Sequence, residues 1–319
     1  MSDSRPVVLV YYPRRGEEYR SLLLERDPTL SLRVCETVED VKAQIGQIDV
    51  LFTSVTLPPS LIHLGKRLRW VQAIGAGVDS FIYKTSFPKG ILLSRITVSF
   101  GERIAEYVMG YILYVAQHIG EVVSNQTLRR WKAPESGVSL LNGKVLGIMG
   151  VGAVGGTVAR AADGFGMDVI GLDVLPRELP TVRKTYSLDG LSEFLSQVHY
   201  LVICLPLTRQ TEGMLGREQF AAMRGDAYVV NVARGAIIKE KELIRALEEG
   251  LIKGAILDVF EEEPLPSASP LWTMKSVVVS PHIAGGASPK EMVDFFVANL
   301  ERFRRGEPLQ GVVDLERGF

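Results

Sequence analysis

Three polar groups suited to proton transfer and anion binding follow three separate apolar runs of this 319-residue chain. Arg234 ends the run AYVVNVAR, the acidic run 261–263 follows KGAILDV, and His282 follows SVVVSP. A histidine whose imidazolium is stabilised by a carboxylate is a competent acid near neutral pH. An arginine offers a bidentate anchor for a carboxylate. The trio therefore suits reversible hydride transfer at the carbonyl carbon of a 2-keto acid, which needs both functions.

The chain has four histidines, and only one combines several features of a catalyst. His282 stands at an expected strand end, after a proline and before a glycine pair that lets the backbone approach a ligand. We expect the other three, His63, His118 and His199, to be packing or capping residues. His282 is therefore the expected proton donor.

The three acids of the run EEE are not equivalent. An ordinary solvated charge run is the expectation for Glu261 and Glu262. Glu263 differs because Pro264 restricts it to an extended conformation, which can fix the direction of its side chain. A glutamate of this run is the expected partner of the histidine.

The second part of the chain predicts a doubly wound α/β domain, because strand-like runs alternate with helical sequence. In such a sheet, ligands bind beyond the carboxyl ends of the strands, so Arg234, the glutamate and His282 are expected to meet beside a cofactor. The runs are KVLGIMG (144–150), DVIGLDV (168–174), HYLVICLP (199–206), AYVVNVA (227–233), KGAILDV (253–259) and SVVVSP (276–281).

A glycine loop, GVGAVGG, directly follows the first of these runs. Gly150 suits a tight turn, Gly152 close approach to a pyrophosphate, and Gly155 close packing of helix on strand. Asp173, eighteen residues after Gly155, is placed to accept hydrogen bonds from ribose hydroxyls and to repel a 2′-phosphate. The loop therefore predicts NAD(H), with NADP(H) less favoured, although Arg177 could offset part of the repulsion.

The first part of the chain has the same alternating rhythm, with strand-like runs at 7–12, 32–36, 49–54 and 68–75, and the pattern changes after 88–95. We expect a substrate-binding domain over 1–98 and 287–319 and an NAD-binding domain over 99–286. The first is discontinuous because a capped helix expected at 288–306 packs back onto it.

One long helical segment, 100–131, is apolar on most faces and must be covered on several sides. Either it is a core helix between domains or it forms a subunit interface, and the pattern leaves both open. Its most apolar stretch, 107–116, is about half the length that crosses a bilayer, so no membrane span is expected.

Composition excludes several classes of partner. With 36 basic and 37 acidic residues and no long basic run, the chain lacks the electrostatic footprint of a nucleic-acid-binding protein. Cys35 and Cys204 lie in apolar runs without metal-ligand spacing, so core packing is expected and a metal site is not. The N-terminus lacks a signal-peptide pattern, and a cytoplasmic protein is expected.

Five segments together resemble the D-isomer-specific 2-hydroxyacid dehydrogenase family. The resemblance implies a Rossmann NAD-binding domain, a smaller flavodoxin-like substrate domain, hydride transfer between a nicotinamide and a 2-keto acid, and a homodimer built around the helix after residue 100. It assigns the catalytic roles to Arg234, Glu263 and His282. The segments are AIGAGVDS (73–80), LNGKVLGIMGVGAVG (141–155), ICLPLTRQTEGMLG (203–216), NVARGAIIKEKELIRALEEGLIKGAILDVFEEEPLP (231–266) and SPHIAGG (280–286).

The same resemblance implies further ligand contacts. Ala76 and Gly77, with Arg234, are implied to hold the substrate carboxylate, the first two through backbone N–H groups. Asp258 matches the ligand of the nicotinamide carboxamide. The implied cofactor-binding residues are Gly150, Gly152, Ala153, Val154, Gly155, Asp173, Leu205, Pro206, Thr211, Val232, Ala233, Asp258, His282 and Gly285.

Departures from the family pattern bear on the substrate. The segment 91–106 lacks an asparagine that many relatives carry, and Ser80 stands where histidine or asparagine is common. The pattern FG-x-x-IAEYV at 100–108 resembles the glyoxylate and hydroxypyruvate reductase-like branch. Pro281 replaces the glutamine of formate-oxidising relatives, so formate is not expected. Phosphoglycerate dehydrogenase-like activity is an alternative, although the chain ends without the regulatory domain of longer relatives. An NAD-sensing corepressor-like scaffold is another.

Overall fold

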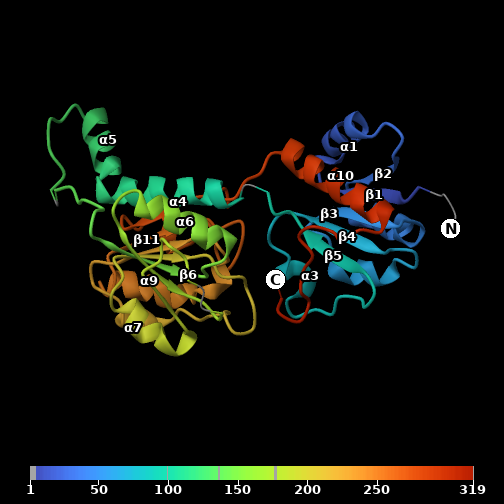
Figure 1. The fold of residues 1–319 in the computed structure, drawn as a ribbon. Coiled ribbons are helices and arrows are strands. Elements are labelled where there is room, and N and C mark those ends of the chain that lie inside the picture. The colour runs from blue at the N-terminus through green and yellow to red at the C-terminus, as the bar shows by residue number, and fades with distance from the viewer. Residues whose placement is uncertain (1–4, 99, 136, 176–177, 319) are drawn as a thin grey trace. The chain divides into compact units, whose positions relative to one another are not determined.

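A computed structural model describes residues 5–98, 100–135, 137–175 and 178–318. The chain divides into two units, one of Met1–Ser99 with Ala287–Phe319 and one of Phe100–Gly286. Each unit is a parallel sheet with helices on its faces, so the predicted α/β class with two parallel sheets is confirmed (Figure 1).

The sheet of the first unit has five strands in the order β2-β1-β3-β4-β5, all parallel. This is a flavodoxin-like order, in which the strand order reverses between β1 and β3. The strands are β1 (Val7–Tyr11), β2 (Ser31–Cys35), β3 (Val50–Ser54), β4 (Trp70–Ile74) and β5 (Leu92–Arg95). The central strands β3 and β4 are buried at every residue, because helices cover both of their faces.

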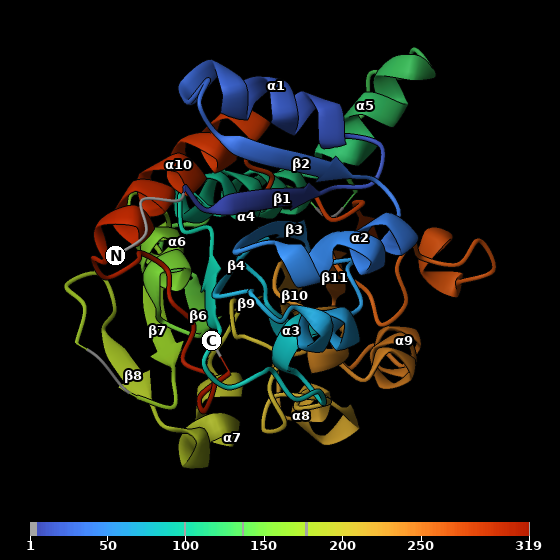
Figure 2. The ribbon, with the colours of Figure 1, turned by 90° about the vertical axis from the view of Figure 1, so that its right-hand side faces the viewer.

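Helix α10 brings C-terminal residues into the core of this unit. It lies beside α1 on one face of the sheet (Figures 1 and 2). Phe296 of α10 stacks on Phe52 and Trp70, with ring centroids 4.3 and 5.3 Å apart. The helices of the unit are α1 (Gly16–Arg26), α2 (Val38–Gln44), α3 (Asp79–Ile82) and α10 (Pro289–Arg305), with 3-10 turns η1 (Ile45–Gln47) and η2 (Pro59–Leu64).

The caps of α10 confirm the helix predicted at 288–306. The Ser288 hydroxyl accepts from the N–H of Glu291, and the Glu291 carboxylate accepts from the N–H of Ser288. Pro289 occupies the first turn, and Gly306 ends the helix in the left-handed conformation. These are local signals, which is why the sequence alone could locate this helix.

The sheet of the second unit has seven parallel strands in the order β12-β11-β10-β9-β6-β7-β8. The order reverses between β6 and β9, as in a dinucleotide-binding fold. The strands are β6 (Val145–Met149), β7 (Asp168–Leu172), β8 (Lys184–Tyr186), β9 (Tyr200–Ile203), β10 (Tyr228–Asn231), β11 (Gly254–Leu257) and β12 (Val277–Val279). The sequence predicted six of them and missed β8, a three-residue edge strand too short to show periodicity.

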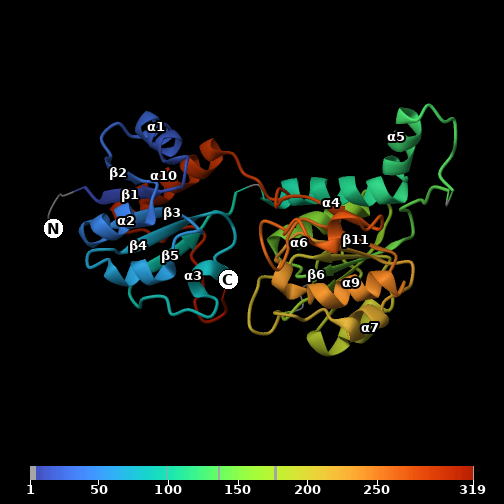
Figure 3. The same cartoon turned by 180° about the vertical axis from the view of Figure 1, so that it is seen from behind.

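Helices cover both faces of the second sheet. Helices α4 and α6 lie on one face, and α7 and α9 on the other (Figures 1 and 3). The helices are α4 (Phe100–Ala116), α5 (Ile119–Thr127), α6 (Ala153–Asp163), α7 (Leu191–Leu195), α8 (Arg217–Ala221) and α9 (Glu240–Glu248), with 3-10 turns η3 (Leu188–Gly190), η4 (Gly235–Ile237) and η5 (Pro270–Trp272).

The prediction of a single long helix over 100–131 is wrong. It is two helices, α4 and α5, because His118 adopts a left-handed conformation with φ of 51° and breaks the hydrogen-bond ladder. The N–H of Ser139 then bonds the carbonyl of Ala116, the last residue of α4. Helix α5 projects from the body of its unit (Figures 1 and 3). A left-handed histidine carries no glycine or proline signal, so the break was not visible in the sequence.

Over the described ranges, no helix combines the length and apolar character that a bilayer span requires.

Candidate active site

The glycine loop joins β6 to α6, and its three glycines have different surroundings. Gly150 has a φ of 92°, and a Cβ there would lie 2.9 Å from the carbonyl oxygen of Cys204. A Cβ on Gly155 would collide with the backbone of Gly150. Gly152 differs because nothing lies within 4 Å of where its Cβ would be. Packing within the unit accounts for two of the glycines, and the third borders open space that a ligand can approach.

The open glycine is also the N-cap of α6. No side chain caps this end, and Gly152 and Ala153 are exposed while Val154 is half-buried. A helix N-terminus of this kind presents backbone N–H groups and a positive dipole end. The residues therefore fit the pyrophosphate of a dinucleotide.

Asp173 directly follows β7 and binds the same loop. Its Oδ2 accepts a hydrogen bond from the N–H of Val151 at 2.8 Å, and its Oδ1 accepts from the N–H of Leu175 at 3.0 Å. The carboxylate thus braces the glycine loop, a role that sequence reasoning did not identify. Arg177, which was expected to modulate coenzyme choice, lies outside the described residues.

The cofactor-binding residues implied after β9 and β10 are mostly buried. Thr211 is 3% exposed, donates to the carbonyl of Pro206 at 2.7 Å and accepts from the N–H of Thr208 at 2.8 Å. Leu205 and Ala233 belong to the hydrophobic core of the unit. Thr211 therefore stabilises the conformation of the loop after β9. A cofactor could contact this loop only through the loop's exposed atoms. Val232 and Gly285 are half-buried.

Glu263 and His282 are directly hydrogen-bonded. His282 Nδ1 lies 2.7 Å from Glu263 Oε2, and Glu263 Oε1 accepts from the N–H of Phe260 at 3.1 Å. Because an ionised carboxylate can only accept, Nδ1 is the donor and Nε2 is the ring nitrogen left for a substrate. His282 has a left-handed φ of 54°, and half of its side chain is exposed. The pair has the geometry of an oriented proton donor.

The other two acids of the run lie elsewhere. Glu261 accepts from the N–H of Glu240 at 3.0 Å, and Glu240 accepts in return from the N–H of Glu261 at 3.3 Å. Burial, together with Glu261 and Glu262, raises the pKa of Glu240. Glu261 therefore ties its loop to the start of α9 and is more than the solvated charge that the sequence suggested. Glu262 is exposed, as expected.

Asp258 organises the loop that carries His282. The residue is 1% exposed. Its Oδ1 accepts from the Ser280 hydroxyl at 2.6 Å and from the N–H of Ile283 at 2.8 Å, and its Oδ2 accepts from the N–H of Ala284 at 2.8 Å. Its backbone carbonyl accepts from the N–H of His282 at 2.9 Å. One residue thus fixes the backbone on both sides of the histidine.

Helix α4 adds a tyrosine to this arrangement. Tyr107 Oη lies 2.6 Å from Ser280 Oγ. Since the serine proton goes to Asp258, Tyr107 is the donor in this bond. Burial raises the pKa of Tyr107, which keeps the phenol neutral and able to donate. Sequence reasoning missed Tyr107 because nothing in an apolar helix indicates which side chain reaches the 280–286 segment.

Arg234 follows β10 on the same edge of the sheet. It is half-buried, and its Nη1 donates to the carbonyl of Ala233 at 2.6 Å. A Cβ on the next residue, Gly235, would collide with the peptide between Phe260 and Glu261. The segment with Arg234 therefore packs against the acidic loop, and β10, β11 and β12, which precede the three expected catalytic residues, are neighbours in the sheet.

Ala76 and Gly77 belong to the other unit, where they form the loop after β4. Gly75 begins this loop with a φ of 134°, and all three residues are half-buried. The loop lies at the carboxyl end of its sheet, the edge at which ligands of doubly wound folds bind.

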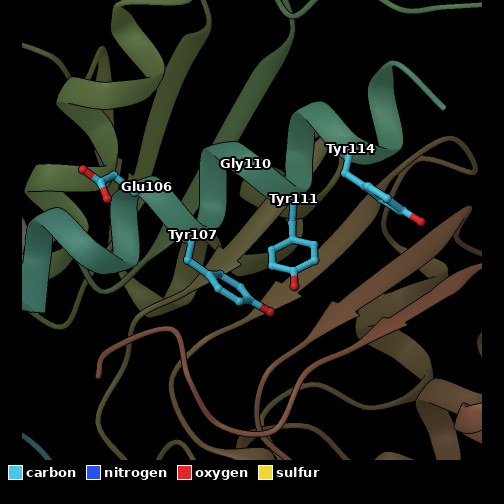
Figure 4. A pocket seen from close by; sticks show the side chains of 5 residues that line it. All are labelled: Glu106, Tyr107, Gly110, Tyr111 and Tyr114. Atoms are coloured by element: carbon cyan, nitrogen blue, oxygen red, sulfur yellow. The ribbon is translucent and has the colours of Figure 1, made fainter. Parts of the chain in front are cut away.

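A shallow pocket of about 220 Å³ lies along α4 (Figure 4). Glu106, Gly110 and three tyrosines, Tyr107, Tyr111 and Tyr114, line it. The rings of Tyr107 and Tyr111 have centroids 4.4 Å apart. Tyr107 thus borders this pocket and also bonds Ser280.

Known proteins resemble this chain over nearly its whole length. The family model described as the NAD-binding domain of D-isomer specific 2-hydroxyacid dehydrogenase matches residues 109–284. A glyoxylate/hydroxypyruvate reductase A from Klebsiella pneumoniae is 30% identical over 320 residues, which cover 98% of this chain and 99% of that protein.

Two solved structures are also similar. An NADPH-dependent glyoxylate/hydroxypyruvate reductase from Sinorhizobium meliloti, in complex with NADP and sulfate, has a TM-score of 0.88 at 28% identity over 99% of this chain and 100% of that one. A D-isomer specific 2-hydroxyacid dehydrogenase from Xanthobacter autotrophicus Py2, in complex with NADPH and MES, has a TM-score of 0.86 at 30% identity over 98% and 100%.

The matched family model covers more than half of the chain, and it spans the glycine loop, Arg234, Glu263 and His282. The protein therefore belongs to the D-isomer specific 2-hydroxyacid dehydrogenase family, and it is an oxidoreductase of D-2-hydroxy acids that uses a pyridine nucleotide.

Proposed function

We propose that the protein reduces small 2-keto acids such as glyoxylate and hydroxypyruvate, with His282 as the proton donor. The observation that carries this proposal is the 2.7 Å hydrogen bond from His282 Nδ1 to Glu263, whose other oxygen is held by the N–H of Phe260. It orients the ring and leaves Nε2 to protonate the carbonyl oxygen. Relatives named glyoxylate/hydroxypyruvate reductases support the choice of substrate.

The remaining groups bind and orient the substrate. Arg234 pairs with its carboxylate and polarises its carbonyl, because a guanidinium can serve both oxygens at once. The N–H groups of Ala76 and Gly77 hold the same carboxylate. A bound dihydronicotinamide would supply the hydride.

NAD(H) is the preferred coenzyme in this proposal. Asp173 follows β7, the position at which an acidic residue hydrogen-bonds the ribose hydroxyls and repels a 2′-phosphate. The solved structures from Sinorhizobium meliloti and Xanthobacter autotrophicus contain NADP or NADPH. The preference for NAD(H) over the coenzyme of those structures therefore depends on the charge of Asp173 alone. Asp258 binds the nicotinamide in this proposal. Its Oδ2 accepts one N–H, and a carboxylate oxygen can accept a second hydrogen bond, here from the nicotinamide carboxamide.

The protein acts as a homodimer in this proposal, with α4 and the arm that follows it as the contact surface. The arm, defined as residues 119–135 and 137–143, carries exposed apolar side chains, and the tyrosine-lined pocket lies along α4. Apolar surface of this kind on a projecting segment is typical of an interface. The exposed residues are Ile119, Val122, Val123, Leu128, Trp131, Val138 and Leu140.

The proposal is tested by steady-state oxidation of NADH and of NADPH with glyoxylate, hydroxypyruvate, 3-phosphohydroxypyruvate, pyruvate and longer 2-keto acids. We expect turnover of the two-carbon and three-carbon acids. A marked preference for 3-phosphohydroxypyruvate would move the protein to the phosphoglycerate dehydrogenase alternative. Absence of turnover with every acid, although NADH binds, would contradict the enzymatic proposal.

The role of His282 is tested with His282→Gln, and His63→Gln is the matched control because His63 is an exposed histidine that bonds the carbonyl of Ser86. Loss of general acid catalysis predicts a fall in kcat of about 10² to 10⁴-fold for His282→Gln, with NADH affinity nearly unchanged. The control should keep wild-type rates. Near-normal turnover of His282→Gln would remove the proton-donor role.

A further inference from the structure

A half-buried arginine outside the expected catalytic trio is the last residue of β5, an edge strand of the first sheet. Arg95 ends β5, and its N–H donates to the carbonyl of Gly311 at 2.9 Å. No acidic side chain of the described residues forms an ion pair with it. Burial alone lowers the pKa of its guanidinium, because no neighbouring carboxylate opposes the effect. A half-buried cation without a counter-ion in the described part of the chain favours an anion bound nearby.

The loop that Arg95 contacts is the one expected to hold the substrate carboxylate. Strands β4 and β5 are parallel neighbours, with Ala73 opposite Arg95, so both strands end at the same edge. The Gly75 carbonyl accepts from the N–H of Ile96 at 3.0 Å, and the Ala76 carbonyl accepts from Arg95 Nη1 at 3.2 Å. The end of β5 therefore holds two successive carbonyls of this loop.

Holding these carbonyls orients the N–H groups of the same peptides. Both peptides are trans, so the N–H of Ala76 points opposite to the Gly75 carbonyl, and the N–H of Gly77 points opposite to the Ala76 carbonyl. Neither N–H donates a hydrogen bond to any described residue. Two successive N–H groups directed away from β5 are donors available to an oxygen anion.

We propose that Arg95 is a positioning residue for the substrate carboxylate, which fixes the Ala76–Gly77 peptide and supplies the positive charge behind the two N–H donors. This inference rests on the proposed function and adds a second cation to substrate recognition. If Arg95 only held the Ala76 carbonyl by a hydrogen bond, its side chain would not need a charge. Substitutions that remove the charge, the hydrogen bond or both therefore distinguish the two roles.

Three variants make this separation. Arg95→Gln removes the charge and keeps an N–H donor on a shorter side chain, Arg95→Lys keeps the charge without the planar fork, and Arg95→Met removes both. Arg33→Gln is the matched control, because Arg33 lies on β2, at the opposite edge of the same sheet, and bonds Gln47. Circular dichroism and Tm show which variants fold.

For Arg95→Gln we expect the KM for glyoxylate and the Ki for oxalate to rise about 10-fold or more, with kcat changed less than about 3-fold and NADH affinity unchanged. Arg95→Lys should recover part of the loss, and Arg33→Gln should match the wild type. A KM within 2-fold of the wild type in Arg95→Gln would overturn the charge role. A defect in Arg95→Met alone would also overturn it, because the hydrogen bond would then suffice.

A measurement on the wild type avoids dependence on variant folding. Oxalate added to the NADH-bound protein should shift the amide resonances of Ala76 and Gly77 and slow their hydrogen exchange. Unchanged resonances in a protein that turns over glyoxylate would defeat this inference and leave the proposed function intact. Shifts with oxalate in a protein that reduces no 2-keto acid would defeat the proposed function and leave the anion site intact.

Discussion

Asp173 Oδ2 accepts a hydrogen bond from the N–H of Val151 at 2.8 Å, so the residue expected to select the coenzyme also braces the glycine loop. These two functions depend on different properties of one carboxylate. The charge would oppose a 2′-phosphate, whereas the oxygen atom alone suffices for the hydrogen bond.

Asp173→Asn should separate the two functions. It keeps an acceptor oxygen for Val151 but loses the one that accepts from Leu175, so Tm should fall only slightly. Loss of the charge should raise kcat/KM with NADPH relative to NADH by about 10-fold or more. Asp173→Ala should relax coenzyme choice in the same direction and lower the unfolding free energy more than Asp173→Asn does, by about 1 to 2 kcal/mol, because the N–H groups of Val151 and Leu175 both lose their acceptor. Steady-state kinetics with both coenzymes and thermal unfolding check this. An unchanged coenzyme ratio in both variants would show that another group sets it.

Glu263→Gln should lower kcat without weakening NADH binding. A glutamine has a single acceptor oxygen, so it can bond either His282 or the N–H of Phe260 but not both. It also cannot stabilise an imidazolium by charge, so kcat with glyoxylate should fall by about 10 to 100-fold. Glu261→Gln is the control, because Glu261 bonds the start of α9 and not the histidine. Equal losses in the two variants would argue against a specific pairing of Glu263 with His282.

Tyr107→Phe should lower kcat, because Tyr107 bonds Ser280 and Ser280 bonds Asp258, which holds the loop of His282. It removes the donor to Ser280, and we expect kcat to fall several-fold while the KM for NADH is retained, with stability lower by about 1 kcal/mol. Ser280→Ala should be more severe because it also removes a donor to Asp258, and Ser280→Thr should restore most of the rate. If Tyr107→Phe lowers Tm but leaves kcat unchanged, the hydrogen-bond chain is structural only.

His199 should make stability depend on pH in the acidic range. Burial is the largest cause that lowers the pKa of His199 below its ordinary value of 6.5, and its Nδ1 accepts from the N–H of Val145 at 3.0 Å. The unfolded chain then binds the proton more readily, so this stabilisation is present above pH 6.5 and is lost as the pH falls through the lower, folded pKa. His199→Asn should flatten the dependence of Tm on pH between about 7 and 5. An unchanged slope would exclude His199 as its source.

Trp131→Ser should weaken self-association. Trp131 is fully exposed on the arm after α4, where an apolar ring of this size favours an interface. We expect a concentration-dependent monomer by sedimentation analysis, while Trp272→Ser should behave as the wild type because that indole, although also exposed, bonds the carbonyl of Pro266. A monomeric wild type would contradict the homodimer directly.

Local patterns in the sequence determined most of the fold. Four of the five strands of the first sheet, six of the seven strands of the second, the caps of α10 and the glycine loop each depend on residues within one short segment. Apolar periodicity, capping side chains and glycine spacing are visible there. Strand β8 and the break at His118 were missed because a three-residue strand and a left-handed histidine carry no such signal.

The sequence also selected the residues with suitable chemistry at strand ends, namely Arg234, a glutamate of the acidic run, and His282. Only the tertiary structure decided how they are held. The bonds of Asp258 to the histidine loop, of Tyr107 to Ser280 and of Arg95 to the Ala76 carbonyl join residues that are distant along the chain. Such bonds depend on the direction in which each side chain leaves its element, which periodicity does not encode because it reports burial and not partners.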